Sequence, residues 1–326
     1  MLRVAYEEAR ILWRRQPIER VLAGEVDPAT RERLELTLAA RVYAREQLGL
    51  SVGGSYSSLA EVDEGQVIYV VTAAPRDRLV PYTWWFPIAG RVPYRGYFDR
   101  EEARALAAQL ERDGYDTYVR SSVAFSTLGW FDDPLLTNLL RLEPERLVDV
   151  VLHELLHSTI YLSGQTAFNE SFASFVGARG AIDFFTRRGE DERARHAGDL
   201  WEDSLTFSRI LGEALAEIEA AYTSGVTAEE REGLFAAVRA RFESARWRTS
   251  SHSDMSEATL NNAVLVHLRL YYDRLSLFDD ALRANGENLK DTITKIADTA
   301  RDAADPFGVL VSTPAQTSIS SSRRMP

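Results

Sequence analysis

The residues best suited to chemistry in this chain are His153, Glu154 and His157, within the run Val-Leu-His-Glu-Leu-Leu-His at 151–157. Two histidines four residues apart lie one turn apart on the same face of an α-helix. Their imidazoles can reach one zinc ion, and the glutamate beside the first of them can accept a proton from water. The motif therefore predicts a zinc-dependent peptidase with His153 and His157 as metal ligands and Glu154 as the catalytic base.

The residues around this motif predict that it lies on a buried helix. Glu143 and Pro144 favour a helix start, because proline fits the first helical position and acidic residues suit the positive end of the helix dipole. Apolar side chains then cover most of the circumference of 147–156, which is typical of a helix inside a protein. Burying two histidines and a glutamate is unfavourable unless each has a partner, and a metal ion with its water supplies one. The alternative is a helix with two core histidines that are hydrogen-bonded to the backbone.

A second predicted helix, at 166–180, offers the third ligand that a catalytic zinc site needs. Thr166 is its candidate N-cap and Gly180 its candidate end. Glu170 shares one face of this helix with small residues, which allow the helix to approach its neighbour closely and the carboxylate to reach the metal. The alternative for Glu170 is an exposed surface carboxylate. Weaker candidates for the third ligand are His196, Asp183 and Asp149.

The spacing of these residues narrows the class of zinc peptidase. In metzincins a third histidine follows the second at a position that is Ser163 in this chain, so that arrangement is excluded. A glutamate at the thermolysin spacing would fall at Gly177. The gap to Glu170 is shorter, but an Asn-Glu pair on a following helix matches the thermolysin arrangement.

These motifs resemble those of a known family, the bacterial putative aminopeptidases, which are glutamate-zincins. The blocks that carry the resemblance are 84–90 running into 93–98, then 125–134, 153–176, and Asn261 to Ala263 with Tyr271. The resemblance extends over most of 1–285 and implies a zincin-like, thermolysin-type fold. It also implies that His153, His157 and Glu170 hold zinc, that Glu154 is the catalytic base, and that the substrate is a peptide.

A peptidase of this kind also needs a hydrogen-bond donor for the oxyanion that forms during hydrolysis. The resemblance places Tyr271 at a matched position, so it is the first candidate, and His252 and Tyr161 follow. Arg95, which lies between two tyrosines, is a candidate for binding a substrate carboxylate. Its alternative is an ion pair within the fold.

The chain departs from this family at two points. Members often have cysteine at the positions of Trp85 and Arg91, and they often begin with a lipoprotein-type export signal. The opening residues 1–8 are amphipathic and lack the charged-then-apolar pattern of a signal peptide. The sequence as it stands therefore predicts a cytoplasmic protein, whereas a truncated or processed start predicts the cell envelope or periplasm.

The composition is that of an ordinary globular protein. The 326 residues are 45% hydrophobic and 27% charged, and the chain has no cysteine, which excludes disulfides. No apolar run approaches the roughly 20 residues of a membrane-spanning helix. The net charge of −11 argues against general nucleic-acid binding, which relies on clustered cations.

The patterns along the chain predict an α+β fold that is predominantly α. We expect an N-terminal helical segment at 1–50, a zincin core at 51–180 with a small sheet before the metal helix, a helical C-terminal subdomain at 181–305 and a disordered tail at 306–326. Strands are expected at 66–73, 82–88 and 117–125, with a helix at 101–112 and further helices at 191–223, 228–246, 257–285 and 289–303. The strand from Thr117 is the expected edge strand, and 127–131 is expected to line the cleft.

Two functions follow from these observations. The first is a zinc peptidase that acts on short peptides, with aminopeptidase action implied by the family. The second is a non-hydrolytic zinc-binding protein of peptidase ancestry that binds a partner. The presence of Glu154 favours the first, because a structural zinc site needs no base.

Overall fold

The computed structural model describes residues 13–62, 68–86, 90–122, 132–250, 252, 255 and 258–311. Within them the protein is predominantly helical with small sheets, as an α+β fold that is mostly α requires. The predicted cleft lining at 127–131 and the serine-rich part of the tail lie outside the described residues. No described helix is both long enough and apolar enough to cross a membrane.

Two consecutive helices carry the predicted metal ligands. The first, α5 (Pro144–Thr159), starts with proline in its first turn, as the sequence predicts. The second, α6 (Thr166–Arg187), has Gln165 rather than Thr166 at its N-cap position and continues through Gly180. The predicted end at Gly180 is therefore wrong. A Cβ at Gly180 would lie 2.6 Å from Cδ1 of Leu152, so this glycine allows close helix packing instead of ending the helix.

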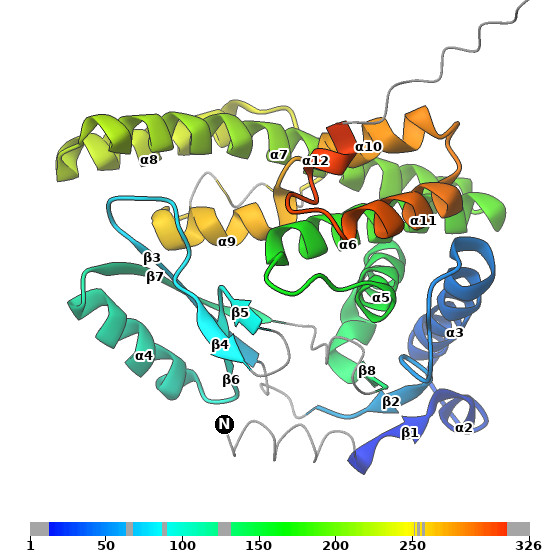
Figure 1. Cartoon of the computed structure of the whole chain (residues 1–326). Helices are drawn as coiled ribbons and strands as arrows, with labels where there is room; N and C mark the ends of the chain where they lie inside the picture. The colour runs from blue at the N-terminus through cyan, green and yellow to red at the C-terminus, as the bar shows by residue number, and fades with distance from the viewer. Residues whose placement is uncertain are drawn as a thin grey trace, which may run out of the picture.

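One apolar cluster packs α5 and α6 against helices from both ends of the chain. Phe172 of α6 stacks on Phe278, with the ring centroids 5.5 Å apart, and Phe168 meets Phe307 edge-on at 5.2 Å. Figure 1 shows these helices on one side of the molecule. They are α2 (Ile18–Leu22), α3 (Pro28–Tyr43), the π-helix Ala44–Leu48, α10 (Leu275–Ala284), α11 (Leu289–Ala300) and α12 (Gly308–Val311).

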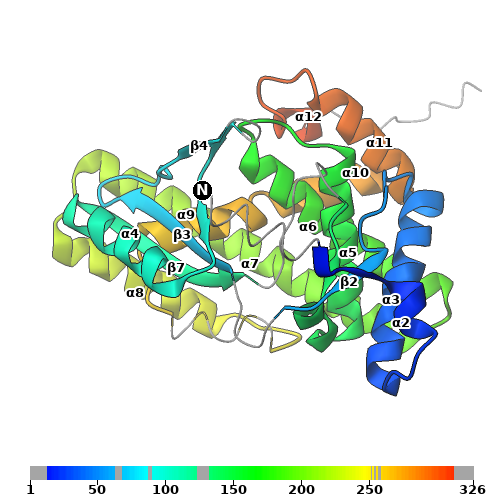
Figure 2. The same cartoon turned by 90° about the horizontal axis from the view of Figure 1, so that it is seen from below.

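An antiparallel sheet lies on the other side of the molecule in both views (Figures 1 and 2). Its strand order is β6 (Arg95–Tyr97), β3 (Ile68–Pro75) and β7 (Tyr115–Ser122), so β7 is an outer strand among the described residues. Helix α4 (Arg100–Arg112) covers the face of Val71 and Val119. The opposite face meets α9 (Asn262–Tyr272).

The long helix α7 (Asp191–Ser224) connects the two sides. Residues in its first half, such as Trp201, belong to the cluster around α5 and α6. Residues in its second half, such as Ile218, pack with α8 (Ala228–Ser244) and α9 in a second apolar cluster. The α5–α6 pair and the sheet with α9 are therefore held against a common helix.

The helix predicted at 257–285 is two helices. Helix α9 ends at Tyr272 and α10 starts at Leu275, with Arg274 in the left-handed region at φ 51°. The guanidinium of Arg274 lies 3.8 Å from the ring centroid of Phe307. The prediction of one helix was wrong because no glycine or proline marks this break.

The remaining described elements are short. They are β1 (Gln16–Pro17), β2 (Ser58–Ala60) and β8 (Leu135–Leu136) in one sheet, the hairpin of β4 (Trp84–Phe86) and β5 (Gly90–Val92), and the 3-10 helix Thr137–Arg141.

Candidate metal centre

His153, His157 and Glu170 are brought together where α5 and α6 pack side by side. The Nε2 atoms of the two histidines are 3.3 Å apart. Oε2 of Glu170 lies 3.3 Å from Nε2 of His153 and 3.6 Å from Nε2 of His157. Three atoms that share a tetrahedral zinc ion at about 2.0–2.2 Å lie roughly 3.3–3.6 Å from one another. The donor set and its spacing therefore fit zinc, and it is the only such group that the described part of the chain contains.

The electrostatics of this group favour a cation. Burial acts to raise the pKa of Glu170, but the charge and hydrogen bonds of His157 and His153 hold that pKa well below its usual range. Burial also acts to lower the pKa of His153, yet the hydrogen bond with Glu170 and the charges of Glu154 and Glu170 raise it to about 9. The carboxylates thus stabilise positive charge at this point, whether it is carried by a proton or by a metal ion.

Glu154 is half-buried beside the candidate metal ligands, and its Oε2 atom is buried without a hydrogen-bond partner. A buried carboxylate oxygen without a donor is unfavourable, and such atoms are few in native proteins. Tyr56 lies nearby with a left-handed φ of 58°. Burial and the charges of Glu154 and Asp133 hold the pKa of Tyr56 well above its usual value. Glu154 is therefore a carboxylate with an unoccupied acceptor position next to the ligand group.

The loop between α5 and α6 is held by Asn169, the residue before Glu170. Its side-chain oxygen accepts a hydrogen bond from the backbone N–H of Leu162 at 3.0 Å, and its amide donates to the carbonyl of Leu162 at 2.8 Å. Asn169 itself is buried. The Asn-Glu pair thus combines a residue that fixes the chain reversal with the residue that completes the metal group.

Gly177 allows α6 to approach α5 at the level of His153. A Cβ at this position would lie 2.7 Å from the backbone oxygen of Asp149 and 3.3 Å from Cβ of His153. Real Cβ atoms do not approach backbone oxygens so closely, so a larger residue would push the helices apart. The small residues that the sequence placed around Glu170 therefore set the separation of the ligand-bearing helices.

Three tyrosines surround the ligand group. The ring of Tyr271 lies 6.4 Å from that of His153 at an interplanar angle of 26°, and the ring of Tyr161 lies 6.4 Å from that of His157 at 74°. Burial and the charge of Glu170 hold the pKa of Tyr271 well above its usual value. The pKa of Tyr94 is raised for the same reasons. These phenols therefore stay protonated and can act as hydrogen-bond donors.

The position of Tyr271 relative to Glu170 is fixed by a direct tie between α6 and α9. The buried hydroxyl of Ser171 donates to the backbone carbonyl of Leu270 at 3.1 Å. Ser171 follows Glu170, and Leu270 precedes Tyr271. One hydrogen bond between the neighbours of Glu170 and Tyr271 therefore fixes these two residues relative to each other.

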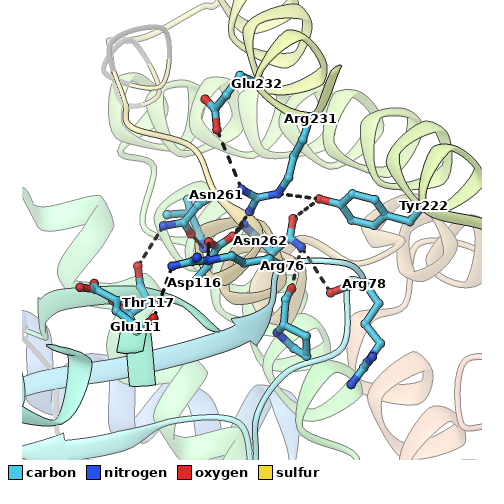
Figure 3. Close-up of polar contacts among 12 residues, drawn as sticks. Arg76, Arg78, Glu111, Asp116, Thr117, Tyr222, Arg231, Glu232, Asn261 and Asn262 are labelled. Carbon is cyan, nitrogen blue, oxygen red and sulfur yellow. Dashed lines mark hydrogen bonds and ion pairs between the residues drawn. The ribbon is translucent and has the colours of Figure 1, made fainter. Parts of the chain in front are cut away.

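The other end of α9 is attached to the sheet by the asparagine pair of the fourth motif, as Figure 3 shows. Asn261 caps the helix through its side-chain oxygen, and its amide donates to the carbonyl of Thr117 at 3.0 Å. The backbone N–H of Asn262 donates to the Asp116 carboxylate at 2.9 Å. The Asn262 amide donates to the carbonyl of Pro75 at 2.8 Å. This pair therefore joins α9 to both β3 and β7.

A second layer of contacts in Figure 3 surrounds the Asp116 carboxylate. It pairs with Arg231 of α8 and lies 3.5 Å from Nε of Arg76. Arg231 also donates to the hydroxyl of Tyr222 at 3.2 Å, and that hydroxyl donates to the side-chain oxygen of Asn262 at 2.7 Å. The buried charge is thus fully partnered, and the network has a positioning role at a distance from the metal group.

Strand β7 and helix α9 run alongside each other from this network to the metal centre. Two strand residues advance about 6.6 Å and four to five helical residues about 6–7.5 Å, so alternate strand side chains can meet successive helical turns. The resulting pairs are Asp116 with Asn262, Tyr118 with His267, and Arg120 with Tyr271.

Two residues predicted for the site lie elsewhere. Arg95 places its guanidinium 5.2 Å from the ring centroid of Tyr97, on the sheet face that α4 covers. His252 packs against Phe207 and Trp247, with ring centroids 5.0 and 5.3 Å away, in the second apolar cluster. Neither residue contacts the candidate metal ligands.

The weaker candidates for the third ligand do not join the histidine pair. Asp183 accepts hydrogen bonds from Tyr43 and from Arg187, each at 2.6 Å. A carboxylate oxygen of Asp149 lies 3.6 Å from a terminal guanidinium nitrogen of Arg146, and burial raises the pKa of Asp149. Both carboxylates already have cationic or hydroxyl partners that explain their positions.

Sequence reasoning missed Arg120 and gave Tyr94 no role of its own. Arg120 donates to the hydroxyl of Tyr271 at 3.4 Å, and its guanidinium lies 5.9 Å from that ring's centroid. In the block 93–98 the charged residue is Arg95, so the sequence predicts a role for Arg95 and not for Tyr94. Arg120 carried no local signal, because its importance comes from the pairing of β7 with α9.

Neither the comparison with curated proteins nor that with solved structures gives a match. The model of one protein family, described as putative aminopeptidase, matches residues 1–305. The match therefore includes α5, α6, β7 and α9, which form the candidate metal centre and its surroundings. On this basis the chain belongs to the putative aminopeptidase family.

Proposed function

We propose that this protein is a zinc-dependent peptidase of the glutamate-zincin type, with aminopeptidase action on short peptides. The observation that carries the proposal is the convergence of His153, His157 and Glu170 at distances that suit tetrahedral zinc. A small antiparallel sheet before α5 and a glutamate ligand on the following helix support a thermolysin-like arrangement. The family match supports the peptidase part of the proposal.

The chemistry that zinc supplies in such a site is polarisation of a carbonyl group and activation of water near neutral pH. Glu154 accepts the proton of the attacking water through its unpartnered carboxylate oxygen and later passes that proton to the leaving amine. The Tyr271 hydroxyl donates a hydrogen bond to the oxyanion, because its raised pKa keeps it protonated. Tyr94 and Tyr161 are the other donors at the site.

Glu154 also distinguishes this proposal from a non-hydrolytic binding protein. A structural zinc site closes its fourth position and needs no base. Here a carboxylate stands beside the ligand group with a buried oxygen that accepts no hydrogen bond from any described residue. We therefore assign turnover rather than metal-dependent binding.

Digestion of a peptide library by wild type and by Glu154→Gln, both loaded with zinc, tests the assignment. We expect the variant to keep full zinc and to lose at least about a hundredfold in kcat, because a positioned base contributes roughly 10²–10⁴ in rate. Equal cleavage by both proteins would remove Glu154 from the mechanism. Absence of cleavage by wild type would favour the binding protein.

Metal analysis of His153→Ala and Glu170→Ala tests the ligand set separately from activity. Each variant should bind zinc much more weakly than wild type, because it leaves two protein ligands in place of three. Asp183→Ala is the matched control, since that carboxylate lies on α6 outside the ligand group. Full zinc retention by Glu170→Ala would exclude Glu170 as a ligand.

A further inference from the structure

Arg120 on β7 is a cation whose hydrogen-bonding capacity is largely unused. Its Nε atom is buried without a partner. Its other hydrogen bonds run to the hydroxyl of Tyr271 and to the backbone carbonyl of Ser121, each at 3.4 Å. N–H···O bonds are usually about 2.9–3.0 Å long, so both contacts are weak. Among the described residues no carboxylate forms an ion pair with Arg120.

Other arginines inside the protein have the acceptors that Arg120 lacks. Arg179 binds both carboxylate oxygens of Asp279, with Nε and a terminal nitrogen at 2.8 and 2.7 Å. Arg231 pairs with Asp116 and also donates to Tyr222. A guanidinium presents donors in a planar fork that matches a carboxylate. Arg120 presents the same fork without the matching anion.

Arg120 lies at the metal centre rather than elsewhere on the sheet. It projects from the face of β7 that meets α9, beside Tyr271, whose ring is 6.4 Å from that of His153. The guanidinium carbon is 5.9 Å from the Tyr271 ring centroid. The path from His153 to Arg120 across this ring is therefore no longer than about four extended residues at 3.3–3.6 Å each.

The surroundings of Arg120 favour an anion from outside the chain. His267 packs against Tyr118 and Tyr271 on the same face, and burial and the charge of Arg120 lower its pKa to about 3. It is therefore neutral and does not compete for an anion. Glu170 belongs to the proposed ligand group and Glu154 is the proposed base beside it, and neither carboxylate forms an ion pair with Arg120.

We propose that Arg120 binds the C-terminal carboxylate of the substrate, so that the enzyme selects short peptides with a free C-terminus. This inference rests on the proposed peptidase function. The scissile bond lies at the metal centre, and the residues after it, about four at most, reach across Tyr271 to the guanidinium. Longer peptides and C-terminal amides place no carboxylate at that distance.

The test compares trialanine with trialanine amide as substrates of the zinc-loaded 326-residue chain. Wild type should cleave the acid with at least about tenfold higher kcat/KM than the amide, since a hydrogen-bonded charge pair is worth roughly ten- to a hundredfold. Arg120→Gln should lose this preference by a rise in KM for the acid, so that acid and amide are cleaved with similar kcat/KM.

Controls separate anchoring from other roles of Arg120. Arg95→Gln removes a cation from the opposite face of the same sheet and should leave the acid preference unchanged. Arg120→Lys keeps the charge without the fork and should give an intermediate preference. Zinc content and melting temperature report whether each variant is folded. The acid-to-amide comparison of wild type itself needs no variant.

Two results would overturn the inference. One is equal use of acid and amide by wild type. The other is a loss of kcat by Arg120→Gln for both substrates alike, which would mean that Arg120 acts on the reacting carbonyl or only holds Tyr271. Calorimetric titration of zinc-loaded Glu154→Gln with both peptides measures binding without turnover. Tight, acid-selective binding without any turnover by wild type would overturn only the peptidase function, whereas unselective or absent binding would overturn this inference.

Discussion

Buried polar atoms without partners gather around the candidate metal centre. Oε2 of Glu154, Nδ1 of His157, Nε of Arg120 and Nδ1 of His267 all lack a hydrogen bond. Native proteins leave few such atoms, so those that occur near one another mark a place where a ligand, water or ion completes the structure. Oε2 of Glu154 and Nε of Arg120 are the two of these atoms that the proposed reaction uses, the first for water and the second for a substrate carboxylate.

His267 gives this arrangement a pH dependence. Its ordinary pKa of 6.5 is lowered to about 3, first by burial and then by the charge of Arg120. The unfolded chain therefore binds a proton between pH 6.5 and 3 that the folded chain does not, and stability falls as the pH is lowered through this range. At about 1.4 kcal/mol per pKa unit, His267 should account for a loss of about 2 kcal/mol between pH 7.5 and pH 5.

Urea unfolding of metal-free wild type and His267→Gln at these two pH values measures this contribution. Between pH 7.5 and pH 5 the free energy of unfolding should fall by about 2 kcal/mol less in the variant than in wild type. Use of the metal-free form avoids the release of zinc at low pH. An identical pH dependence in both proteins would show that His267 titrates normally.

At the scale of the helices, the separation of α5 and α6 decides whether the ligands converge. Glycine within a helix is usually unfavourable by about 1 kcal/mol relative to alanine. At Gly177 we expect glycine to be more stabilising than alanine, because a Cβ would press on the backbone of Asp149 and on His153. The glycine is therefore explained by the metal centre rather than by the helix that contains it.

We expect Gly177→Ala to lower the free energy of unfolding by about 1–3 kcal/mol, as overpacking usually does, and to weaken zinc binding. Gly212→Ala on α7 is the matched control, because no atom lies within 4 Å of its added Cβ. It should stabilise the protein by up to about 1 kcal/mol and leave zinc content unchanged. Calorimetric melting and metal analysis of both variants decide the point, and a stabilised Gly177→Ala would contradict the close approach.

The elements that sequence reasoning predicted are those with local signals. Helix α5 was predicted from its proline start and apolar surface, and β3, β7 and α4 from alternation and turn residues. The ends of elements were less predictable, since Gly180 packs within α6 and the break at Arg274 carries no breaker residue. These outcomes depend on tertiary contacts that spacing along the chain does not encode.

The candidate site likewise contains residues that the sequence predicts and residues that only the tertiary structure brings together. His153, Glu154, His157 and Glu170 lie within one pair of adjacent helices, so their convergence could be predicted from spacing. Arg120 meets Tyr271 across 151 positions of sequence. Only the pairing of a strand with a distant helix brings these two together, and no local pattern reports it.

Zinc should act on the whole molecule as a crosslink. The chain has no cysteine and therefore no disulfide, whereas the ligand group joins α5 to α6. A ligand that binds only the folded state stabilises it by about 4 kcal/mol at a thousandfold excess over Kd. Removal of zinc should thus lower the melting temperature by several degrees.

Melting curves with zinc and with a chelator test this expectation. Wild type should respond strongly, and Glu170→Ala, which lacks one ligand, should respond weakly or not at all. A melting temperature of wild type that does not depend on zinc would indicate that the ligand group holds no metal in solution.

The pairing of β7 with α9 repeats every two strand residues, because only alternate side chains of β7 face the helix. Insertion or deletion of one residue between Asp116 and Arg120 would turn the Arg120 guanidinium to the α4 face, because strand side chains alternate. The helices that hold the metal would be untouched by such a slip. The proposed hydrolysis and the proposed preference for a free C-terminus therefore depend on different elements, and a one-residue change in β7 should alter the second without the first.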